Sequence, residues 1–148
     1  MPTVHGGDWP EVSLWLDPLG SDSAGRSPEE LARLAVALEE SGFTQLWLSD
    51  PPAADPDDGS LGDPIPWEPF VVAGALATAS RRLGLGVVPG ADRRPAVLAK
   101  LATTLDVLTE GRAAVAVRLE AERADGWDRA LEAAQVCRAV LEDDRPSF

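Results

Sequence analysis

Four short apolar runs, each followed by helix-like sequence, constrain the fold of this chain more than any other feature. The runs are nearly unbroken, as strands buried on both faces are: VSLWL (12–16), QLWLS (45–49), LGLGVV (83–88) and AAVAV (113–117). Strand and helix in alternation, repeated four times, require a parallel sheet with right-handed crossover connections. The sequence therefore predicts an α/β fold of four βα units with a parallel sheet.

The first expected helix carries the clearest boundary signals. Ser27 is its N-cap, Pro28 takes the first helical position and Glu30 completes a capping box, while Gly42 ends it. The other helices are expected over about 69–82, around 97–108 and over about 125–142, where Leu131, Ala134, Cys137 and Leu141 share one side.

The length of 148 residues predicts one domain covering 1–148, large enough to bury on the order of 70% of its unfolded surface. One long irregular stretch, 51–66, holds five prolines, two glycines and four aspartates with no basic residue. A loop of this length without secondary structure is typical of functional or mobile segments. We interpret it as an acidic, proline-rich loop of the same domain.

The net charge, the N-terminal sequence and the length of the apolar runs indicate which partners and which location to expect. Thirteen basic and twenty-five acidic residues give a net charge of −12, which repels nucleic acid and anionic lipid surfaces. The N-terminus lacks the basic and apolar regions of a signal peptide, and no apolar run approaches the roughly 20 residues that span a bilayer. These features predict a soluble cytoplasmic protein without nucleic-acid or membrane partners.

Several familiar site motifs are excluded. Gly84 and Gly86 form a GxG without the third glycine of the dinucleotide fingerprint, and DPDDG (55–59) lacks the ligand spacing of a calcium loop. With one histidine, His5, and one cysteine, Cys137, the chain cannot assemble an ordinary zinc cluster or a Cys/His nucleophilic pair. No metal site is predicted, and Cys137 is expected to be a small core residue.

Polar residues at the expected strand ends are the remaining candidates. Ligands of parallel α/β folds bind at the carboxyl ends of the strands, which places Asp17, Asp50, Pro89 and 118–120 near one rim. Asp50 has two interpretations of about equal weight: it hydrogen-bonds a ligand, or it caps a nearby loop.

Tryptophan is abundant, with five residues beside three phenylalanines and no tyrosine. Trp15 and Trp47 lie within expected strands and are predicted to be in the core. Trp67 follows the acidic loop, where it either covers a planar ligand or anchors the loop as an apolar plug.

Four segments together resemble the bacterial-luciferase-like monooxygenase family, from Val12 to Phe148: SPEELARLAVALEESGFTQLWLSD, PWEPFVVAGALATASRRLGLGVVPG, RRPAVLAKLATTLDVLTEGR and RALEAAQVCRAVLEDDRPSF. The third of these is the most specific. The resemblance implies a TIM-like (β/α)8 barrel, of which this chain would supply the N-terminal half. It also implies a flavin cofactor such as FMN, or the deazaflavin coenzyme F420, at the carboxyl ends of the strands.

The resemblance also assigns expected cofactor contacts. The family commonly has Ser-Asp-His at the end of the second strand, where this chain has Ser49, Asp50 and Pro51, so only the histidine is missing. The family often carries a non-proline cis peptide at the end of the third strand, and Arg118 replaces a glycine-rich turn after the fourth. The expected cofactor-binding residues are Asp50, Gly86, Val87, Val88 and Arg118, and no catalytic residue is assigned.

Half a barrel leaves two sheet edges and apolar surface to be covered. We therefore expect a homo-oligomer or association with a longer homologue, with Val12, Leu14, Leu16, Val115 and Val117 not all covered by helices on one side. Two functions remain open. The chain is either a flavin- or deazaflavin-dependent oxidoreductase acting on a small molecule, its site completed by a dimer or a partner, or a non-catalytic relative with a structural or regulatory role.

Overall fold

Strand and helix alternate four times in the described part of the chain, as the apolar runs predict. The computed structural model describes residues 11–16, 27–50, 67–90, 93–119 and 124–142, so the 51–66 loop, Asp17 and Glu120 lie outside it. The elements are β1 (Ser13–Leu16), α1 (Pro28–Glu40), β2 (Gln45–Ser49), α2 (Pro69–Ala79), β3 (Gly84–Val88), α3 (Pro95–Thr109), β4 (Ala113–Val115) and α4 (Gly126–Glu142).

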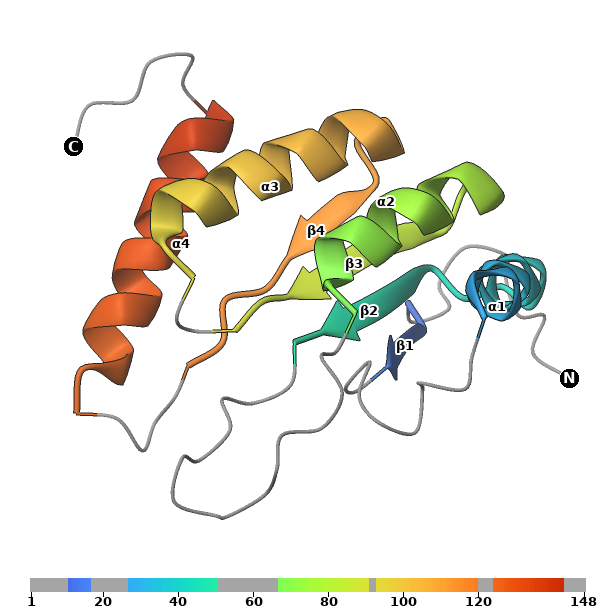
Figure 1. The fold of residues 1–148 in the computed structure, drawn as a ribbon, viewed down its shortest axis with the longest axis horizontal. Helices are drawn as coiled ribbons and strands as arrows, with labels where there is room; N and C mark the ends of the chain where they lie inside the picture. Colours follow the sequence, from blue (N-terminus) through green and yellow to red (C-terminus); the bar gives the residue numbers. More distant parts are fainter. Residues whose placement is uncertain (1–10, 17–26, 51–66, 91–92, 120–123, 143–148) are drawn as a thin grey trace, which may run out of the picture.

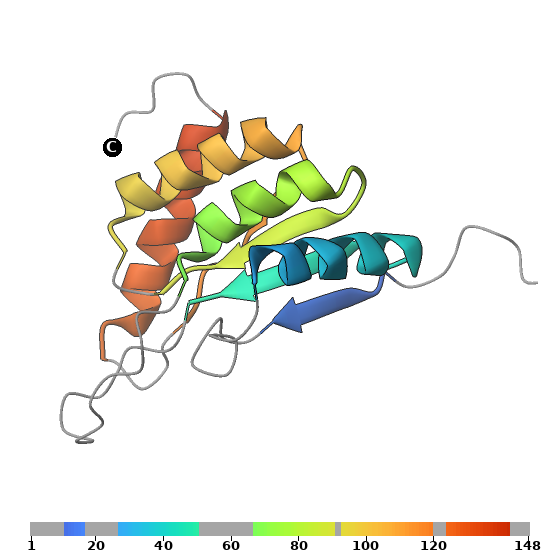
Figure 2. The ribbon, with the colours of Figure 1, turned by 45° about the vertical axis from the view of Figure 1, so that its right-hand side comes forward.

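The strands form one sheet in the order β1-β2-β3-β4, and each neighbouring pair is parallel. The helices α1, α2 and α3 lie over the same face of this sheet, and α4 lies beside α3 (Figures 1 and 2). The opposite face carries no described helix. This is the arrangement of a barrel wall, with helices outside and an inner face toward the barrel axis.

The core lies between the sheet and the helices. Its members on the strands are the leucines and valines at alternating positions, such as Leu46, Leu48, Leu85 and Val87, all at most 1% exposed. Helical residues from α1 to α4 complete the same cluster, including Leu31, Ala35, Phe70, Leu76, Leu98, Leu105, Ala133 and Cys137. Cys137 is buried as predicted, and burial raises the pKa of its thiol.

The five apolar positions named above are not all covered, as expected, but four of them are partly buried. Leu14, Leu16, Val115 and Val117 pack against the core cluster from its margin. The sheet register puts these residues on the helix side, because they are in line with the buried leucines and valines of β2 and β3. Only Val12 is largely exposed, at 49%.

The inner face carries the tryptophans that were predicted to be in the core. Trp15, Trp47, Gly86 and Ala114 lie in register across the four strands. The rings of Trp15 and Trp47 stack with centroids 6.2 Å apart at 23°, and Trp15 is 54% exposed. The prediction for this pair was wrong because an unbroken apolar run does not reveal that one face of the strand has no cover.

Two helices differ from their predicted limits or faces. The first helix has the expected capping box, formed by Ser27 and Glu30, and Gly42 adopts the left-handed conformation after it. Helix α2 ends at Ala79, about three residues early. On α4, Ala133 and Cys137 face the core, whereas Leu131 is 57% exposed, so its buried stripe is rotated from the predicted one.

The early end of α2 has a clear cause in a carboxylate from α1. Glu39 Oε2 accepts hydrogen bonds from the backbone N–H groups of Arg81, Arg82 and Leu83, at 2.9, 2.8 and 3.1 Å. These groups would otherwise continue the helix or bond to water. The hydrogen bonds, with that from Arg82 the largest, hold the pKa of Glu39 below its ordinary value of 4.5.

This contact predicts an acid-sensitive contribution to stability. A carboxyl group with a lowered pKa in the folded state stabilises the fold above its unfolded pKa and loses that contribution as the pH falls through the folded pKa. We expect Glu39→Gln to lower the melting temperature at pH 7 and to flatten its decline below about pH 4.5. The matched control is Glu40→Gln on the exposed side of α1. Equal melting curves for the two variants between pH 3 and 7 would contradict the role of Glu39.

Candidate functional site

Asp50 follows β2 directly and makes the central contacts at the carboxyl ends of the strands. Its Oδ2 accepts hydrogen bonds from Gly90 N at 2.8 Å and from Arg93 Nε and Nη2 at 2.9 and 2.7 Å. The side chain is 15% exposed. Among the described residues, Asp50 therefore caps the loop after β3 and neutralises an arginine. Any contact with 51–66 lies outside the described part of the chain.

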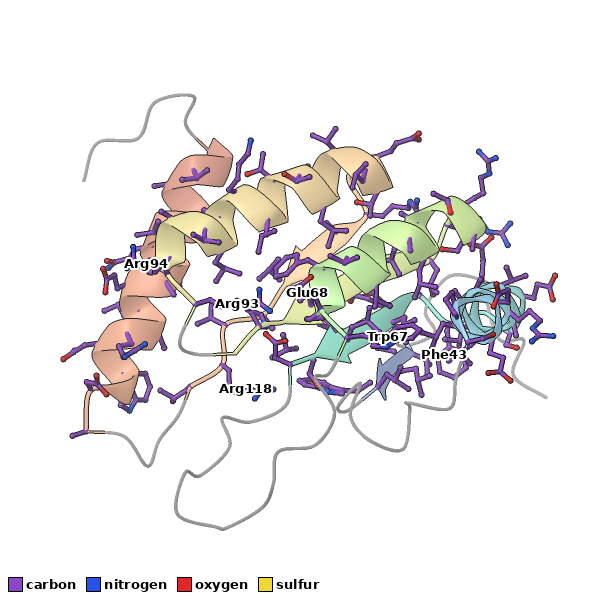
Figure 3. The ribbon with its side chains drawn as sticks, in the orientation of Figure 1. Phe43, Trp67, Glu68, Arg93, Arg94 and Arg118 are labelled. Atoms are coloured by element: carbon purple, nitrogen blue, oxygen red, sulfur yellow. The ribbon has the colours of Figure 1, made fainter. Side chains whose placement is uncertain are left out.

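Arg93 joins Asp50 to a second carboxylate. Its Nη2 lies 2.8 Å from Glu68 Oε1, a charge contact without the alignment of a hydrogen bond, and its guanidinium lies 5.7 Å from the ring centre of Phe70. Glu68 is also the N-cap of α2, because its Oε2 accepts Val71 N at 2.7 Å. Figure 3 shows Arg93 and Glu68 pointing toward one another. One arginine thus connects the end of β2, the start of α2 and the segment before α3.

Sequence reasoning assigned no role to Arg93. The available signal was its place in RRPAVLAK, the most specific part of the family resemblance, just before the proline that opens α3. An arginine at this point follows a strand end and so reaches the rim of the sheet. Its partner could not be chosen from spacing alone, because Asp50 is 43 residues away.

Arg118 reaches the same rim from the segment after β4. Its Nη2 donates a hydrogen bond to the backbone carbonyl of Asp50 at 2.8 Å. The structure therefore brings together two predicted site residues, Asp50 and Arg118, through the main chain of one and the side chain of the other. Within this set of described contacts, the charges of Arg93 and Arg118 balance those of Asp50 and Glu68.

The other predicted contacts, in β3, are less available to a ligand. Val87 is fully buried on the helix side, and Val88 is 3% exposed. Gly86 lies under the Trp47 ring, where an added Cβ would be 2.3 Å from the nearest ring atom. The expected cis peptide is absent among the described residues. Regular parallel ladders to both β2 and β4 run along β3 and hold its backbone in extended trans geometry.

The cavity that the structure describes between the rim and α4 is too small for a flavin-sized ring. The cavity bounded by Gly90, Arg93, Arg118 and Arg129 has a volume of about 20 Å³. Small-molecule sites are typically about 300–1,000 Å³. Next to the rim lies the inner face of the sheet, which no described helix covers, so a ring bound there would need a second wall.

No cluster of three or more His, Cys, Asp or Glu suited to a metal ion occurs in the part of the chain that the structure describes. Within those same ranges, no helix is both long enough and apolar enough to cross a membrane.

Trp67, beside Glu68, is 38% exposed, which leaves both of its predicted roles open.

The family follows from comparison with known proteins. A family model described as luciferase-like monooxygenase matches residues 12–148. The chain belongs to the luciferase-like monooxygenase family. The four parallel strands and four helices that the structure describes form an α/β fold that resembles part of a luciferase-like TIM barrel.

Two curated relatives and one solved structure illustrate the range of this luciferase-like family. The chain is 32% identical over 141 residues to 4-hydroxyprotoasukamycin monooxygenase of Streptomyces nodosus subsp. asukaensis, covering 88% of this chain and 36% of that protein. It is 35% identical over 95 residues to the F420-dependent glucose-6-phosphate dehydrogenase of Kineococcus radiotolerans, covering 62% and 27%. The oxygenating constituent of 3,6-diketocamphane monooxygenase from the CAM plasmid of Pseudomonas putida, solved with FMN, aligns with a TM-score of 0.62 at 16% identity, covering 89% and 39%.

These matches show which cofactors some of the relatives use and how much of the relatives' length this chain spans. The relatives include an F420-dependent enzyme and an FMN-bound oxygenase constituent. The chain spans only 36% and 27% of the length of the two curated relatives. Activity, substrate and partners of this luciferase-like chain are therefore matters for proposal.

Proposed function

We propose that this chain is one wall of a flavin- or deazaflavin-dependent oxidoreductase, whose cofactor site forms when a second half-barrel covers the inner face of its sheet. The observation that carries the proposal is the open inner face beside the rim of Asp50 and Arg118, in a member of a family whose relatives use FMN or F420. In such an enzyme the cofactor transfers the electrons, and the protein binds and orients it.

The proposal assigns a part to the charged residues at the rim and to the two tryptophans of the inner face. Asp50, fixed by Arg93, sets the position of the loop after β3, which borders the site. Arg118 holds the main chain at the end of β2. Trp15 and Trp47 present a flat aromatic surface next to the rim and exclude water once the face is covered.

Titration with oxidised FMN and, separately, with oxidised F420 tests the proposal. We expect saturable quenching of cofactor fluorescence at protein concentrations where the chain is associated, and weaker binding on dilution. The control is an unrelated protein without a flavin site at the same concentration, which reports nonspecific quenching. Failure of both cofactors to bind at every protein concentration would remove the oxidoreductase function.

A second function, as a non-catalytic subunit, is favoured by the internal pairing at the rim. Asp50, Arg93 and Arg118 all bond within the chain, so they stabilise the strand ends without a ligand. Under this alternative the chain associates normally and binds neither cofactor. Fold-level kinship is compatible with both functions, so the titration decides between them.

A further inference from the structure

A groove runs along the edge of β4 that pairs with no described strand. It has a volume of about 330 Å³ and is lined by α3, β4 and its continuation, and α4: Ala102, Asp106, Ala113, Ala114, Val115, Val117, Ala134, Cys137 and Arg138. The lining is mainly small and apolar, with one acidic and one basic residue. Because β4 ends the described sheet, its outer backbone groups face this groove. Such an edge is a template for another strand.

An exposed apolar stripe on α4 continues from the groove. Trp127 and Leu131 are 74% and 57% exposed. They are four residues apart, and Ala134 and Arg138 of the groove follow at helical spacing, so all four lie on one side of the helix. An apolar stripe beside such a strand edge suits the binding of a βα unit. The strand of that unit would pair with β4, and its helix would pack on the stripe.

The opposite edge of the same sheet has the matching character. The four residues of β1 carry no charge. Leu14 and Leu16 point to the helix side at the margin of the core, and Trp15 projects from the inner face. A strand of this kind, added beside β4, would put its leucines under α4 and its tryptophan on the inner side next to Ala114.

Symmetry makes a second copy the occupant of this groove. A two-fold axis parallel to the strands places β1 of each copy beside β4 of the other, in parallel, with both inner faces toward the axis. Both edges of each copy are then paired and the assembly is closed. The contact itself is balanced in charge, because β1 is uncharged and the charges of the groove cancel. The repulsion between two chains of charge −12 acts over longer distances and is screened by salt.

The exposed apolar area supplies a large part of what a dimer of this kind needs to bury. Along the two edges lie five exposed large apolar side chains: Val12, Trp15, Leu119, Trp127 and Leu131. With full areas of up to about 250 Å² for an aromatic residue, these five expose on the order of 500 Å² per chain. Standard interfaces bury about 800 Å² per partner, so these side chains supply more than half of the area that a stable dimer needs.

We propose that the β4 groove and the α4 stripe receive β1 of a second copy, so that two chains close one barrel. This inference rests on the proposed function for its biological purpose, since it names the second half-barrel that completes the site. Its evidence is the uncharged sequence of both edge strands, the groove and the exposed stripe.

Light scattering after size exclusion, over a range of protein concentrations, tests this surface with a matched pair of variants. Wild type should elute at twice the chain mass of 15.6 kDa. Leu131→Glu places a charge on the stripe and should raise the dimer dissociation constant by about tenfold or more. Val107→Glu adds the same charge on α3, where Val107 is 73% exposed, and should leave it unchanged. Circular dichroism confirms that both variants fold.

Labelling of Cys137 by a maleimide gives an independent measure of groove occupancy. Cys137 lines the groove, so its labelling rate should fall as wild-type protein associates and should not fall for Leu131→Glu. A wild-type monomer at all concentrations, or equal dissociation constants for both variants, would overturn the inference. A dimer that binds neither FMN nor F420 supports this surface and removes the proposed function. A monomer that binds either cofactor overturns this surface and also the completion of the site by a second half-barrel, and leaves only the cofactor class of the proposed function standing.

Discussion

Replacing Arg93 by methionine should lower the free energy of unfolding by about 2–3 kcal/mol. The substitution keeps much of the apolar contact with Phe70 but leaves Asp50 and Glu68, at 15% and 35% side-chain exposure, without their shared cation. Removing one member of a mostly buried charge pair costs more than removing both, because the remaining charge stays desolvated. Urea unfolding, followed by circular dichroism, measures the change.

The control for this prediction is the neighbouring arginine. Arg94→Met removes the same charge from an exposed residue whose side chain makes no capping hydrogen bond, so stability should change by about 0.5 kcal/mol or less. A double-mutant cycle with Asp50→Asn isolates the pair: the two substitutions should be less than additive. Equal effects of Arg93→Met and Arg94→Met would show that the rim contacts do not stabilise the fold.

The second large effect is expected at Gly86. An alanine Cβ there would lie 2.3, 2.4 and 2.7 Å from three atoms of the Trp47 ring, so the ring must leave its position against Trp15. We expect Gly86→Ala to lower the free energy of unfolding by about 1–3 kcal/mol and to change tryptophan fluorescence. Because Trp47 borders the proposed cofactor surface, cofactor affinity should change as well.

Gly74→Ala is the matched control for Gly86. Gly74 lies within α2, and a Cβ there would meet Leu108 Cδ1 at 3.5 Å, an ordinary contact. Alanine is favoured over glycine inside a helix by about 0.5–1 kcal/mol, so this variant should be neutral or more stable. If Gly86→Ala proved as stable as Gly74→Ala, the close contact between Gly86 and Trp47 would not exist in solution.

The order and direction of the elements follow from local sequence. Short apolar runs, the capping box at Ser27 and Glu30, and the glycine after α1 act over a few residues, so their signals are readable without the fold. Which face of each strand is covered depends on helices distant in sequence. Leu14 and Trp15 are both apolar, and only the register with β2 shows that one packs against the core and the other is exposed.

The candidate site was predictable in location but not in its contacts. Asp50 and Arg118 meet at the rim because the carboxyl ends of parallel strands lie at one edge of the sheet. This follows from the parallel direction of the strands, which the sequence predicts. Arg93 was missed because its contact with Asp50 depends on the path of the loop before α3. The contacts predicted for Gly86 and Val87 assumed an accessible strand end, whereas Trp47 and the core occupy the space around them.

Sedimentation velocity with detection at both a protein and a cofactor wavelength tests the central claim most directly. The wild-type chain, loaded with FMN or with F420, is run at concentrations on both sides of the dimer dissociation constant. We predict that cofactor absorbance sediments with the species of twice the 15.6 kDa chain mass and is absent from the monomer boundary. Cofactor that sediments with the monomer, or that remains unbound while the dimer forms, would contradict a site completed by a second half-barrel.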